Sequence, residues 1–430
     1  MLSFKDFNVT HHRFKTSNGI NVVLLKSPKM PVAYEVSFLA GSRYDLNDKD
    51  GTAHFLEHIL MGGTKSFPTK DKLSMEIENL GGSLTAYTSA DTLGFRISLG
   101  DPLDIEKSFS VFSEILNNSI FDEKFIETER NVILRESGKL RDSQTSFFKL
   151  ITPKLLYSGT NLRRHNLGNA ETIKSINKQD LLDFMNSHFT GENTSITIAG
   201  DIDEENLKFL IEKYINLPKG KRKKFETQIQ GRRDKFVEFS FYDNENTEFY
   251  LYFKTVNNVH KDKTPLFILS QLLVANRTGI LTKEIRYKRG FAYTLDVDSD
   301  ADVDRGVFSF YTKVRKEDVQ ESIDIFVNEV KKIAKTGPSE EHLKFLKNRR
   351  LKSQKLCYET CASWVVAHSF KNTFFPDLTW TLEDSFREYE NTTAEDIKRV
   401  ANTYFNNDNW YLALSGPVDQ EFVNTIQVKF

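Results

Sequence analysis

The tightest cluster of chemically useful residues in the sequence is the HFLEH segment of residues 54–58. On an α-helix, residues i and i+4 lie one above the other, so His54 and His58 project two imidazoles from one face, and Glu57 lies close to that face. Neutral imidazoles are zinc ligands, and a neighbouring carboxylate is a base for the attacking water. This H-x-x-E-H order, which inverts H-E-x-x-H, predicts a catalytic metal site. The competing interpretation is a surface helix with two unrelated histidines.

A tetrahedral catalytic site uses a third protein ligand and leaves one position open. The segment ETERNVILRES, within a long helix expected at 122–142, carries Glu129 and Glu136 seven residues apart. Seven residues are two helical turns, so the two side chains lie on one stripe. We assign Glu136 as the third ligand and Glu129 as the carboxylate behind the ligands or an electrostatic neighbour. Taken alone, such a stripe is usually a solvated face, and only the histidine motif favours the metal.

The elements that must position these residues follow from hydrophobic periodicity and turn residues. The motif helix is expected at 51–61, where Asp48 or Asp50 would cap its start and Gly51 would permit the turn into it. The other elements expected in this half are strands at 20–27, 33–40, 83–89, 92–99 and 193–200 and helices at 69–79, 104–117, 122–142, 145–157 and 178–189. Strands in hairpin-like pairs and helices in runs predict an α+β fold of mainly antiparallel sheet packed with helices.

An internal repeat predicts two homologous domains. Residues 178–203 resemble residues 394–419 at an offset of 216, and residues 104–116 resemble residues 318–330 at an offset of 214. This period is far too long for a solenoid, so it indicates a tandem duplication. The expected organisation is a metal-bearing domain at 1–218, a basic linker at 219–233 with no apolar period, and a second domain at 234–430.

The two copies are not chemically equivalent. At the offset of 214 the motif residues align with Ile268, Gln271 and Leu272, and at 217 Glu136 aligns with Ser353. No His or Glu occurs anywhere in 264–275, so a small register error cannot supply a second site. We therefore expect one Zn²⁺ per chain, held by the first half, and a degenerate second half that supplies substrate contacts and walls.

Composition narrows the function classes. The chain of 430 residues has 59 Lys+Arg and 60 Asp+Glu, a formal charge of −1, which argues against a dedicated nucleic-acid binder. The longest mostly apolar run, Leu266 to Ala275, is too short for a membrane span. The N-terminal residues show no secretory signal, and two cysteines favour a reducing compartment. A cytoplasmic protein without nucleic-acid or membrane partners is expected.

These motifs resemble the pitrilysin/insulinase/mitochondrial processing peptidase family of zinc metallopeptidases, in a short two-domain form of the bacterial type. The resemblance includes GTAHFLEHILMGGT (51–64), ENLGGSLTAYTS (78–89), the Glu129/Glu136 helix, GNAETIKSINKQDLLDF (168–184) and IRYKRGFAYTLDVDSDADVDRGVFSFY (285–311). It implies that His54, His58 and Glu136 bind zinc and that Glu57 is the general base. It also places the family's second glutamate at Glu129.

The resemblance adds residues that spacing alone does not reveal. Active members carry an Arg and a Tyr seven residues apart in the second half, which correspond here to Arg286 and Tyr293. A guanidinium can hold a substrate carbonyl, and a phenol can donate to an oxyanion. The family's substrate-pairing strand corresponds to the segment Thr85, Ala86, Tyr87 and Thr88, where Thr85 stands in place of the usual Asn.

The expected function is therefore a zinc-dependent endopeptidase that hydrolyses peptides or unstructured polypeptide segments. Members of the family enclose substrate in a chamber of four such domains, so the resemblance implies a homodimer in which Arg286 and Tyr293 of one chain face the metal of the other. Two alternatives stay open. One is a non-catalytic scaffold or partner subunit of a processing-peptidase-like complex, and the other is a heteromeric enzyme whose partner supplies the Arg/Tyr pair.

Overall fold

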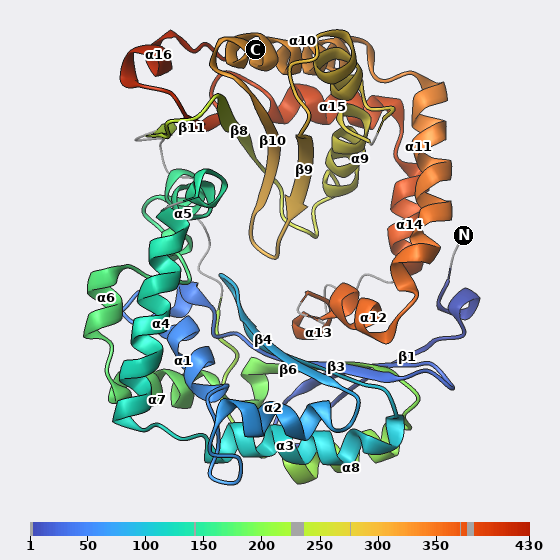
Figure 1. Cartoon of the computed structure of the whole chain (residues 1–430). Helices are drawn as coiled ribbons and strands as arrows, with labels where there is room; N and C mark the ends of the chain where they lie inside the picture. Colours follow the sequence, from blue (N-terminus) through green and yellow to red (C-terminus); the bar gives the residue numbers. More distant parts are fainter. Residues whose placement is uncertain (1–2, 142, 225–235, 276, 370, 376–381) are drawn as a thin grey trace.

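The computed structural model describes residues 3–141, 143–224, 236–275, 277–369, 371–375 and 382–430. These residues form two β-sheets that face one another, each with a layer of helices on its outer side (Figure 1). The predicted α+β class, with two sheet-and-helix units, is confirmed. Part of the predicted linker, residues 225–233, lies outside the described residues.

The first sheet has the strand order β1-β2-β6-β3-β5-β4. Its strands are β1 (Thr10–Lys15), β2 (Asn21–Lys26), β3 (Val32–Phe38), β4 (Ser83–Thr88), β5 (Leu93–Leu99) and β6 (Thr194–Gly200). Neighbouring strands are antiparallel except β2 and β6. Strand β4 forms one edge of the sheet, so one side of its backbone is left for pairing.

The first half contains eight described α-helices. They are α1 (Thr52–Leu60), α2 (Lys70–Glu78), α3 (Ile105–Asn118), α4 (Glu123–Arg141), α5 (Gln144–Tyr157), α6 (Ala170–Ser175), α7 (Lys178–His188) and α8 (Glu204–Tyr214). The apolar faces of α1, α2, α3, α7 and α8 share one core with the outer face of the sheet, the face turned away from the second half. This arrangement buries the hydrophobic stripe that predicted each of the longer helices.

The second sheet repeats the topology of the first. Its strands are β7 (Val237–Phe241), β8 (Asn246–Thr255), β9 (Leu295–Ala301), β10 (Gly306–Arg315) and β11 (Tyr411–Gly416), in the order β7-β11-β8-β10-β9. This order matches β2-β6-β3-β5-β4, and the parallel pair β7–β11 matches β2–β6. The shared order supports the duplication, with β1 as an addition to the first copy and β9 as the counterpart of β4.

The helices of the second half are α9 to α16, together with a π-helical segment, η6 (Thr282–Lys288), between α9 and β9. They are α9 (Lys263–Leu273), α10 (Val319–Thr336), α11 (Glu340–Ser353), α12 (Cys361–His368), α13 (Lys371–Phe374), α14 (Leu382–Asn391), α15 (Ala394–Tyr404) and α16 (Gln420–Thr425). Helices α9, α10, α11 and α15 share a core with the second sheet.

The two halves exchange one helix in each direction across the space between the sheets. Helix α5, from the first half, packs Phe148, Leu155 and Leu156 against the second sheet, where it contacts Tyr252 and Ala413. Helix α12, from the second half, packs Trp364 and Val365 against the inward face of the first sheet, in a cluster that also contains Val23 and Leu25 of β2. Helix α5 lies on the face of the second sheet that the helices of the second half leave uncovered, and α12 lies on the corresponding face of the first sheet (Figure 1). Each sheet is therefore covered on its inward side by the other half.

A buried group of charges ties the tip of the β9–β10 hairpin to the first half. Arg305 forms an ion pair with Asp91 at 2.8 Å, and Arg43 pairs with the same carboxylate at 2.8 Å and with Asp304 at 2.7 Å. Asp91 lies in the turn between β4 and β5, three residues after Thr88. We call this group the hairpin latch. It fixes the second half against the end of the edge strand β4.

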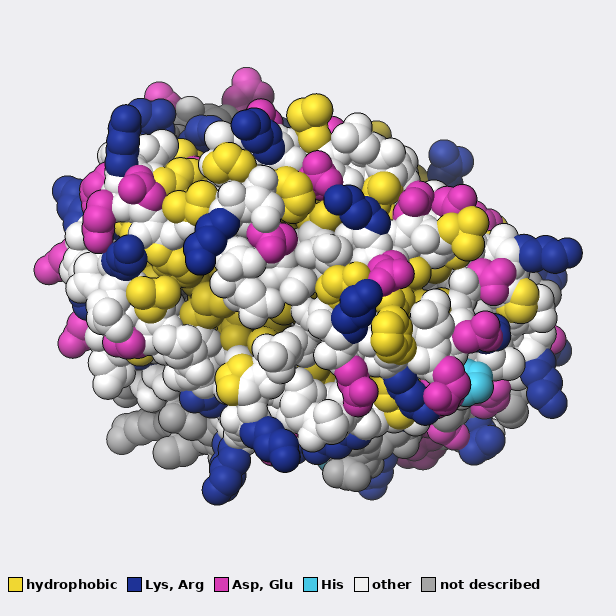
Figure 2. Space-filling model, turned by 90° about the horizontal axis from the view of Figure 1, so that it is seen from below, with side chains coloured by type: hydrophobic (Ala, Val, Ile, Leu, Met, Phe, Trp, Pro, Cys, Tyr) yellow, Lys and Arg dark blue, Asp and Glu magenta, His cyan; other side chains and the backbone are white. Residues whose placement is uncertain are grey.

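No helix in the described part of the chain is long and apolar enough to cross a membrane. Figure 2 shows the face seen from below, where Lys and Arg side chains alternate with Asp and Glu. Neither sign forms a continuous patch on this face, in keeping with the nearly balanced charge of the chain.

Candidate metal centre

Helix α1 begins at a turn that the sequence did not predict correctly. Gly51 has a φ of 100°, a conformation that favours glycine, as expected. The capping residue, however, is Asp45, whose carboxylate accepts hydrogen bonds from the backbone N–H groups of Gly51 at 2.7 Å and Ala53 at 2.8 Å. The prediction of Asp48 or Asp50 was wrong because the chain folds back by one further turn before the helix. Burial raises the pKa of Asp45 to about 8.

The motif residues share the one face of α1 that the core does not cover. Ala53, Phe55, Leu56, Ile59 and Leu60 are buried in the first core. His54, Glu57 and His58 are left half-buried on the opposite face. The apolar residues of the motif helix therefore set its rotation, and this rotation aims both imidazoles away from the sheet.

Helix α4 brings the two glutamates to this face. Its buried Ile126 and Ile133 join the first core, and the guanidinium of Arg130 lies 5.1 Å from the ring centre of Phe55 on α1. These contacts hold the two helices side by side (Figure 1). Glu129 and Glu136 lie on the stripe of α4 that faces the two histidines.

Three potential ligands converge between the helices. The Nε2 atom of His58 lies 3.7 Å from Oε2 of Glu136, and the Nε2 atom of His54 lies 4.0 Å from the same oxygen. One ligand atom from each residue lies within 4.8 Å of the others. Ligands of a tetrahedral zinc ion lie about 3.3 Å apart, so side-chain shifts of about 1 Å bring these atoms to coordination distance. The residues present therefore fit a zinc ion.

The protonation states also fit. Burial, together with the neighbouring His58 and His165, lowers the pKa of His54 to about 3, so this ring is neutral at physiological pH, as a metal ligand must be. His58 Nδ1–H donates to Oε2 of Glu129 at 2.7 Å, and Glu129 is only 9% exposed. This hydrogen bond leaves the lone pair of Nε2 directed toward Glu136. Glu129 thus orients the His58 ring without being one of the three candidate ligands itself.

Glu57 is held by the end of strand β4. The hydroxyl of Thr88 donates to Oε2 of Glu57 at 2.6 Å, and the amide of Asn166 donates to the backbone carbonyl of Thr88 at 3.1 Å. Burial raises the pKa of Glu57, an effect that the hydrogen bond from Thr88 and the nearby His58 oppose. A carboxylate with a raised pKa and a fixed orientation is suited to accept and return a proton.

The four residues predicted to pair with substrate occupy the edge strand, but their side chains differ in role. Thr85 is exposed and Ala86 is half-buried. Tyr87 donates its hydroxyl to the buried Glu35 at 2.9 Å, so this side chain stabilises the sheet. Thr88 contacts Glu57 instead of lying free for a ligand. Strand addition at β4 would therefore use its backbone edge.

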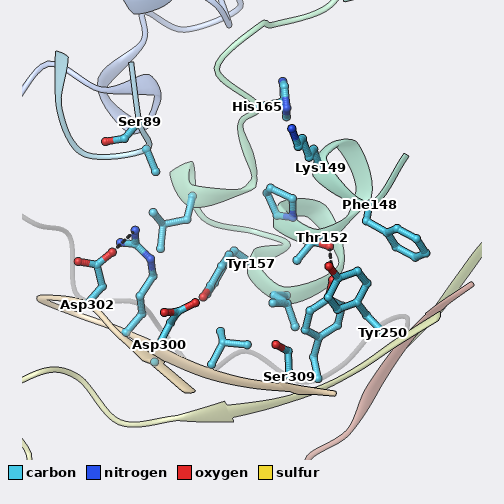
Figure 3. Close-up of a pocket in the computed structure, with 18 of the residues that line it drawn as sticks. Ser89, Phe148, Lys149, Thr152, Tyr157, His165, Tyr250, Asp300, Asp302 and Ser309 are labelled. Atoms are coloured by element: carbon cyan, nitrogen blue, oxygen red, sulfur yellow. Dashed lines mark hydrogen bonds and ion pairs between the residues drawn. The ribbon is translucent and has the colours of Figure 1, made fainter. Parts of the chain in front are cut away.

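His165 and Asn166 were missed by the sequence analysis. Burial, with Lys154 and Lys149 nearby, lowers the pKa of His165 to about 4. Both residues line a cavity of about 720 Å³ between the two halves, next to the residues that contact Glu57. Figure 3 shows its walls: Ser89 from the β4–β5 turn, Tyr157 and Thr152 from α5, and Asp300 from β9. No short motif marks His165 or Asn166, because both reach the site through a long loop.

Arg286 and Tyr293 lie away from the metal cluster of their own chain. They belong to η6 and the segment before β9, whereas α1 and α4 lie at the opposite side of the molecule (Figure 1). The guanidinium of Arg286 lies 4.5 Å from the ring centre of Tyr293, and Tyr293 is 83% exposed. The structure therefore brings these two residues together but does not bring them to the histidines.

The second half repeats the helices without the ligands. Ile268 and Leu272 on α9, which align with the two histidines, are buried in the second core. Among the residues that the structure describes, His54, His58 and Glu136 are the one group of His, Cys, Asp or Glu side chains with metal-binding geometry. The second copy lacks histidines at these positions, and the structure shows that it uses them to build its hydrophobic core.

Comparisons with known proteins agree with this arrangement. Residues 21–170 match a family model described as insulinase (peptidase family M16), and residues 175–350 match one described as the peptidase M16 inactive domain. An uncharacterized zinc protease from Rickettsia bellii (strain RML369-C) is 26% identical over 364 residues, which cover 83% of this chain and 86% of that protein.

Two further similarities support less: one covers under half of the chain, and the other has a low sequence identity. The beta subunit of the mitochondrial-processing peptidase of Dictyostelium discoideum is 33% identical over 202 residues, 47% of this chain and 43% of that protein. The crystal structure of a peptidase M16 inactive domain from Pseudomonas fluorescens has a TM-score of 0.86 at 20% sequence identity and covers 95% of this chain and 99% of that one. At this identity the structural likeness concerns the fold.

Proposed function

The chain belongs to the M16 family of peptidases, and from this premise we propose that it is a zinc-dependent endopeptidase acting on peptides or unstructured polypeptide segments. One observation carries the proposal: two imidazoles from α1 and a carboxylate from α4 converge within 4.8 Å beside the half-buried Glu57. A scaffold would have no need to keep ligands and base in this geometry.

A Zn²⁺ ion held by His54, His58 and Glu136 would supply Lewis-acid polarisation of the scissile carbonyl and of the attacking water. Residues of the chain would transfer the proton and orient the ligands. Glu57 accepts the proton of the attacking water on the oxygen that Thr88 leaves free, and it returns this proton to the leaving amine nitrogen. Glu129 keeps the His58 ring in the orientation and tautomer that a ligand needs.

The edge of β4 gives the substrate its place. An extended peptide that adds to this edge lies in the sheet plane, next to the strand end where Thr88 contacts Glu57. Backbone pairing is insensitive to side-chain identity, which suits a peptidase for many sequences. Most strands of a folded domain are already paired within its own sheet, so peptides and unstructured segments are the substrates that suit this edge.

We further propose that the active site is completed by a second copy of the chain. The exposed Tyr293 stacks on the half-buried Arg286, and both lie in the segment between α9 and β9 of the second half, whereas the metal cluster lies on α1 and α4 of the first half. This separation supports an Arg/Tyr pair that reaches the substrate from another chain. In the homodimer each chain supplies the metal, the base and the edge strand to one site and the Arg/Tyr pair to the other.

The decisive test compares wild type with Glu57→Gln. Both proteins are assayed for bound zinc and for digestion of unstructured peptides, followed by mass spectrometry. We expect the variant to retain one zinc per chain and to lose at least 99% of the cleavage, since the base is lost while the ligands stay. Glu123→Gln, at the exposed start of α4, is the matched control and should cleave normally. Undiminished cleavage by Glu57→Gln would refute the mechanism.

Sharing across chains is tested by mixing two inactive variants. A dimer of one Arg286→Ala chain and one Glu57→Gln chain has one site with both defects and one site with neither. Mixed dimers should therefore recover up to half the activity per dimer, measured against each variant alone. Confirmed mixed dimers that stay inactive would contradict the shared site.

A further inference from the structure

A second cavity, of about 640 Å³, lies in the second half beside η6. It is lined by the loop after α9, by η6, by the start of β9 and by α11, and three of its lining residues are arginines: Arg277, Arg286 and Arg349. Figure 1 shows α9, β9 and α11 next to one another on one side of this half. The family resemblance assigns a role to Arg286 but none to the other two.

The three guanidiniums have no carboxylate partner among the described residues. Arg286 stacks on Tyr293, and neither Arg277 nor Arg349 forms an ion pair or a side-chain hydrogen bond in the described part of the chain. Asp296 is the one acidic residue among those lining the cavity, and one of its oxygens already accepts the N–H of Val297 at 2.9 Å. The cavity therefore carries three positive charges against one negative charge.

Neighbouring arginines behave differently. Arg289, one residue beyond η6, pairs with Glu284 at 3.2 Å and with Glu321 at 2.6 Å. Arg350, next to Arg349 on α11, places its guanidinium 5.3 Å from the ring centre of Phe267 instead of lining the cavity. Like charges that share one cavity repel, and an anion that enters it removes this repulsion.

We propose that this cavity binds a carboxylate of the peptide substrate, an inference that rests on the proposed peptidase function. The planar fork of a guanidinium matches a carboxylate with two parallel hydrogen bonds. The rest of the lining suits a peptide: Val274, Ala275, Leu295 and Phe345 offer apolar contacts. A dianionic phosphate would gain less, because Asp296 opposes a second negative charge.

The carboxylate has two possible sources in a peptide, the C-terminal α-carboxylate and an Asp or Glu side chain. Both present the same pair of oxygens to the cavity. In the proposed homodimer, Arg286 lines this cavity and also contacts the peptide bound at the metal site of the other chain. Carboxylate recognition would then favour substrates with a negative charge at a fixed distance from the scissile bond.

The test measures binding in the Glu57→Gln background, which does not cleave the peptide during the measurement. Fluorescent peptides of one sequence are compared by anisotropy in three forms: a free C-terminus with internal Glu, an amidated C-terminus with internal Glu, and a free C-terminus with internal Gln. We expect one of the two neutralised forms to bind at least tenfold more weakly, and that form identifies the source of the carboxylate.

Three variants test whether this preference depends on the cavity. Arg277→Gln combined with Arg349→Gln should weaken binding of the preferred peptide about tenfold and abolish the discrimination, whereas Arg350→Gln should leave both unchanged. If Arg349→Lys replaces Arg349→Gln in the double variant, part of the affinity should return, because lysine keeps the positive charge. Circular dichroism checks that each variant is folded.

Equal binding of all three peptides, or unchanged discrimination in the double variant, would overturn the proposal. Stronger competition by inorganic phosphate than by acetate would also overturn it and assign the cavity to phosphate. Peptide binding in this background does not require hydrolysis, so an inactive wild type with intact carboxylate discrimination would refute the peptidase function and leave the cavity's role in peptide binding standing.

Discussion

At the scale of single residues, the hydroxyl of Thr88 fixes the orientation of Glu57, the proposed general base. It donates to one oxygen of Glu57 at 2.6 Å, so in the proposed mechanism the other oxygen accepts the proton of the attacking water. A β-branched threonine has few side-chain rotamers, and its backbone carbonyl is held by Asn166. The orientation of Glu57 is therefore set by an edge strand that would also hold the substrate.

Replacing Thr88 with valine should slow catalysis without weakening substrate binding. Valine keeps the shape but loses a hydrogen bond to a charged group, worth about 1.5–3 kcal/mol, so kcat should fall about 10- to 100-fold while KM changes less than threefold. Thr88→Ser keeps the hydroxyl and should retain most of the activity. Zinc content should stay the same in both. An equal loss in the serine and valine variants would show that the hydroxyl is not responsible.

The spacing of residues predicted the convergence of the candidate ligands but not the residues that surround them. His54, Glu57 and His58 could be placed on one helix face because the helical period is fixed, and the two-turn spacing of Glu129 and Glu136 put both on one stripe. The role of Asp45 as a cap could not be predicted, because it depends on a turn six residues before Gly51. His165 reaches the site from a loop whose path no local pattern encodes.

At the scale of elements, the hairpin latch joins the β9–β10 hairpin of the second half to the β4–β5 turn of the first. Asp91 and Arg43 are buried at 4% exposure each, so their charges are stabilised by one another and by Arg305 and Asp304. Buried ion pairs are costly to break, because the remaining partner keeps its desolvation cost. The latch therefore fixes the position of the second half relative to strand β4, which ends at Thr88.

Replacing Arg305 with methionine should destabilise the protein by about 2–4 kcal/mol, since Asp91 would keep Arg43 but lose half of its compensating charge. Urea unfolding of the metal-free protein measures this change. Arg315→Met provides a control, because the Arg315 side chain is 62% exposed and solvent screens its charge. A loss below 0.5 kcal/mol in Arg305→Met would mean that the latch contributes nothing to the association of the halves.

Periodicity predicted most elements to within two residues but not their partners. The helices expected at 51–61, 104–117 and 178–189 and all five strands of the first half are present. Strand β1 and helix α8 were not predicted. The helix expected at 145–157 is α5, yet its apolar stripe faces the second sheet. An amphipathic pattern tells that a face is buried and does not tell which surface covers it.

At the scale of the whole molecule, several buried histidines make the fold sensitive to acid. Burial lowers the pKa of His188 to about 4 and that of His368 to about 4, and the two rings come from different halves. In the unfolded chain both have a pKa near 6.5. Between these values the unfolded state binds protons that the folded state excludes, so stability is lost as pH falls from about 6.5 toward 4.

Each of the two histidines should therefore cost the protein about 2 kcal/mol of unfolding free energy between pH 7 and pH 5. Urea unfolding of the metal-free protein at both pH values measures the loss. The difference between the two pH values should shrink by about 2 kcal/mol in His188→Gln and stay unchanged in His260→Gln, whose ring is 42% exposed. An undiminished difference in His188→Gln would contradict the role of this ring.

The packing of α5 and α12 on the opposite sheets limits which mutations the protein tolerates. Mutation has removed the ligands from the second copy, and their positions now carry Ile268 and Leu272 in a hydrophobic core. The copy itself cannot be discarded, because a truncated product would expose the apolar surfaces that the two helices cover and would aggregate. Selection can therefore erase chemistry from one half while it must preserve that half's shape, which leaves its surface free to acquire new binding preferences.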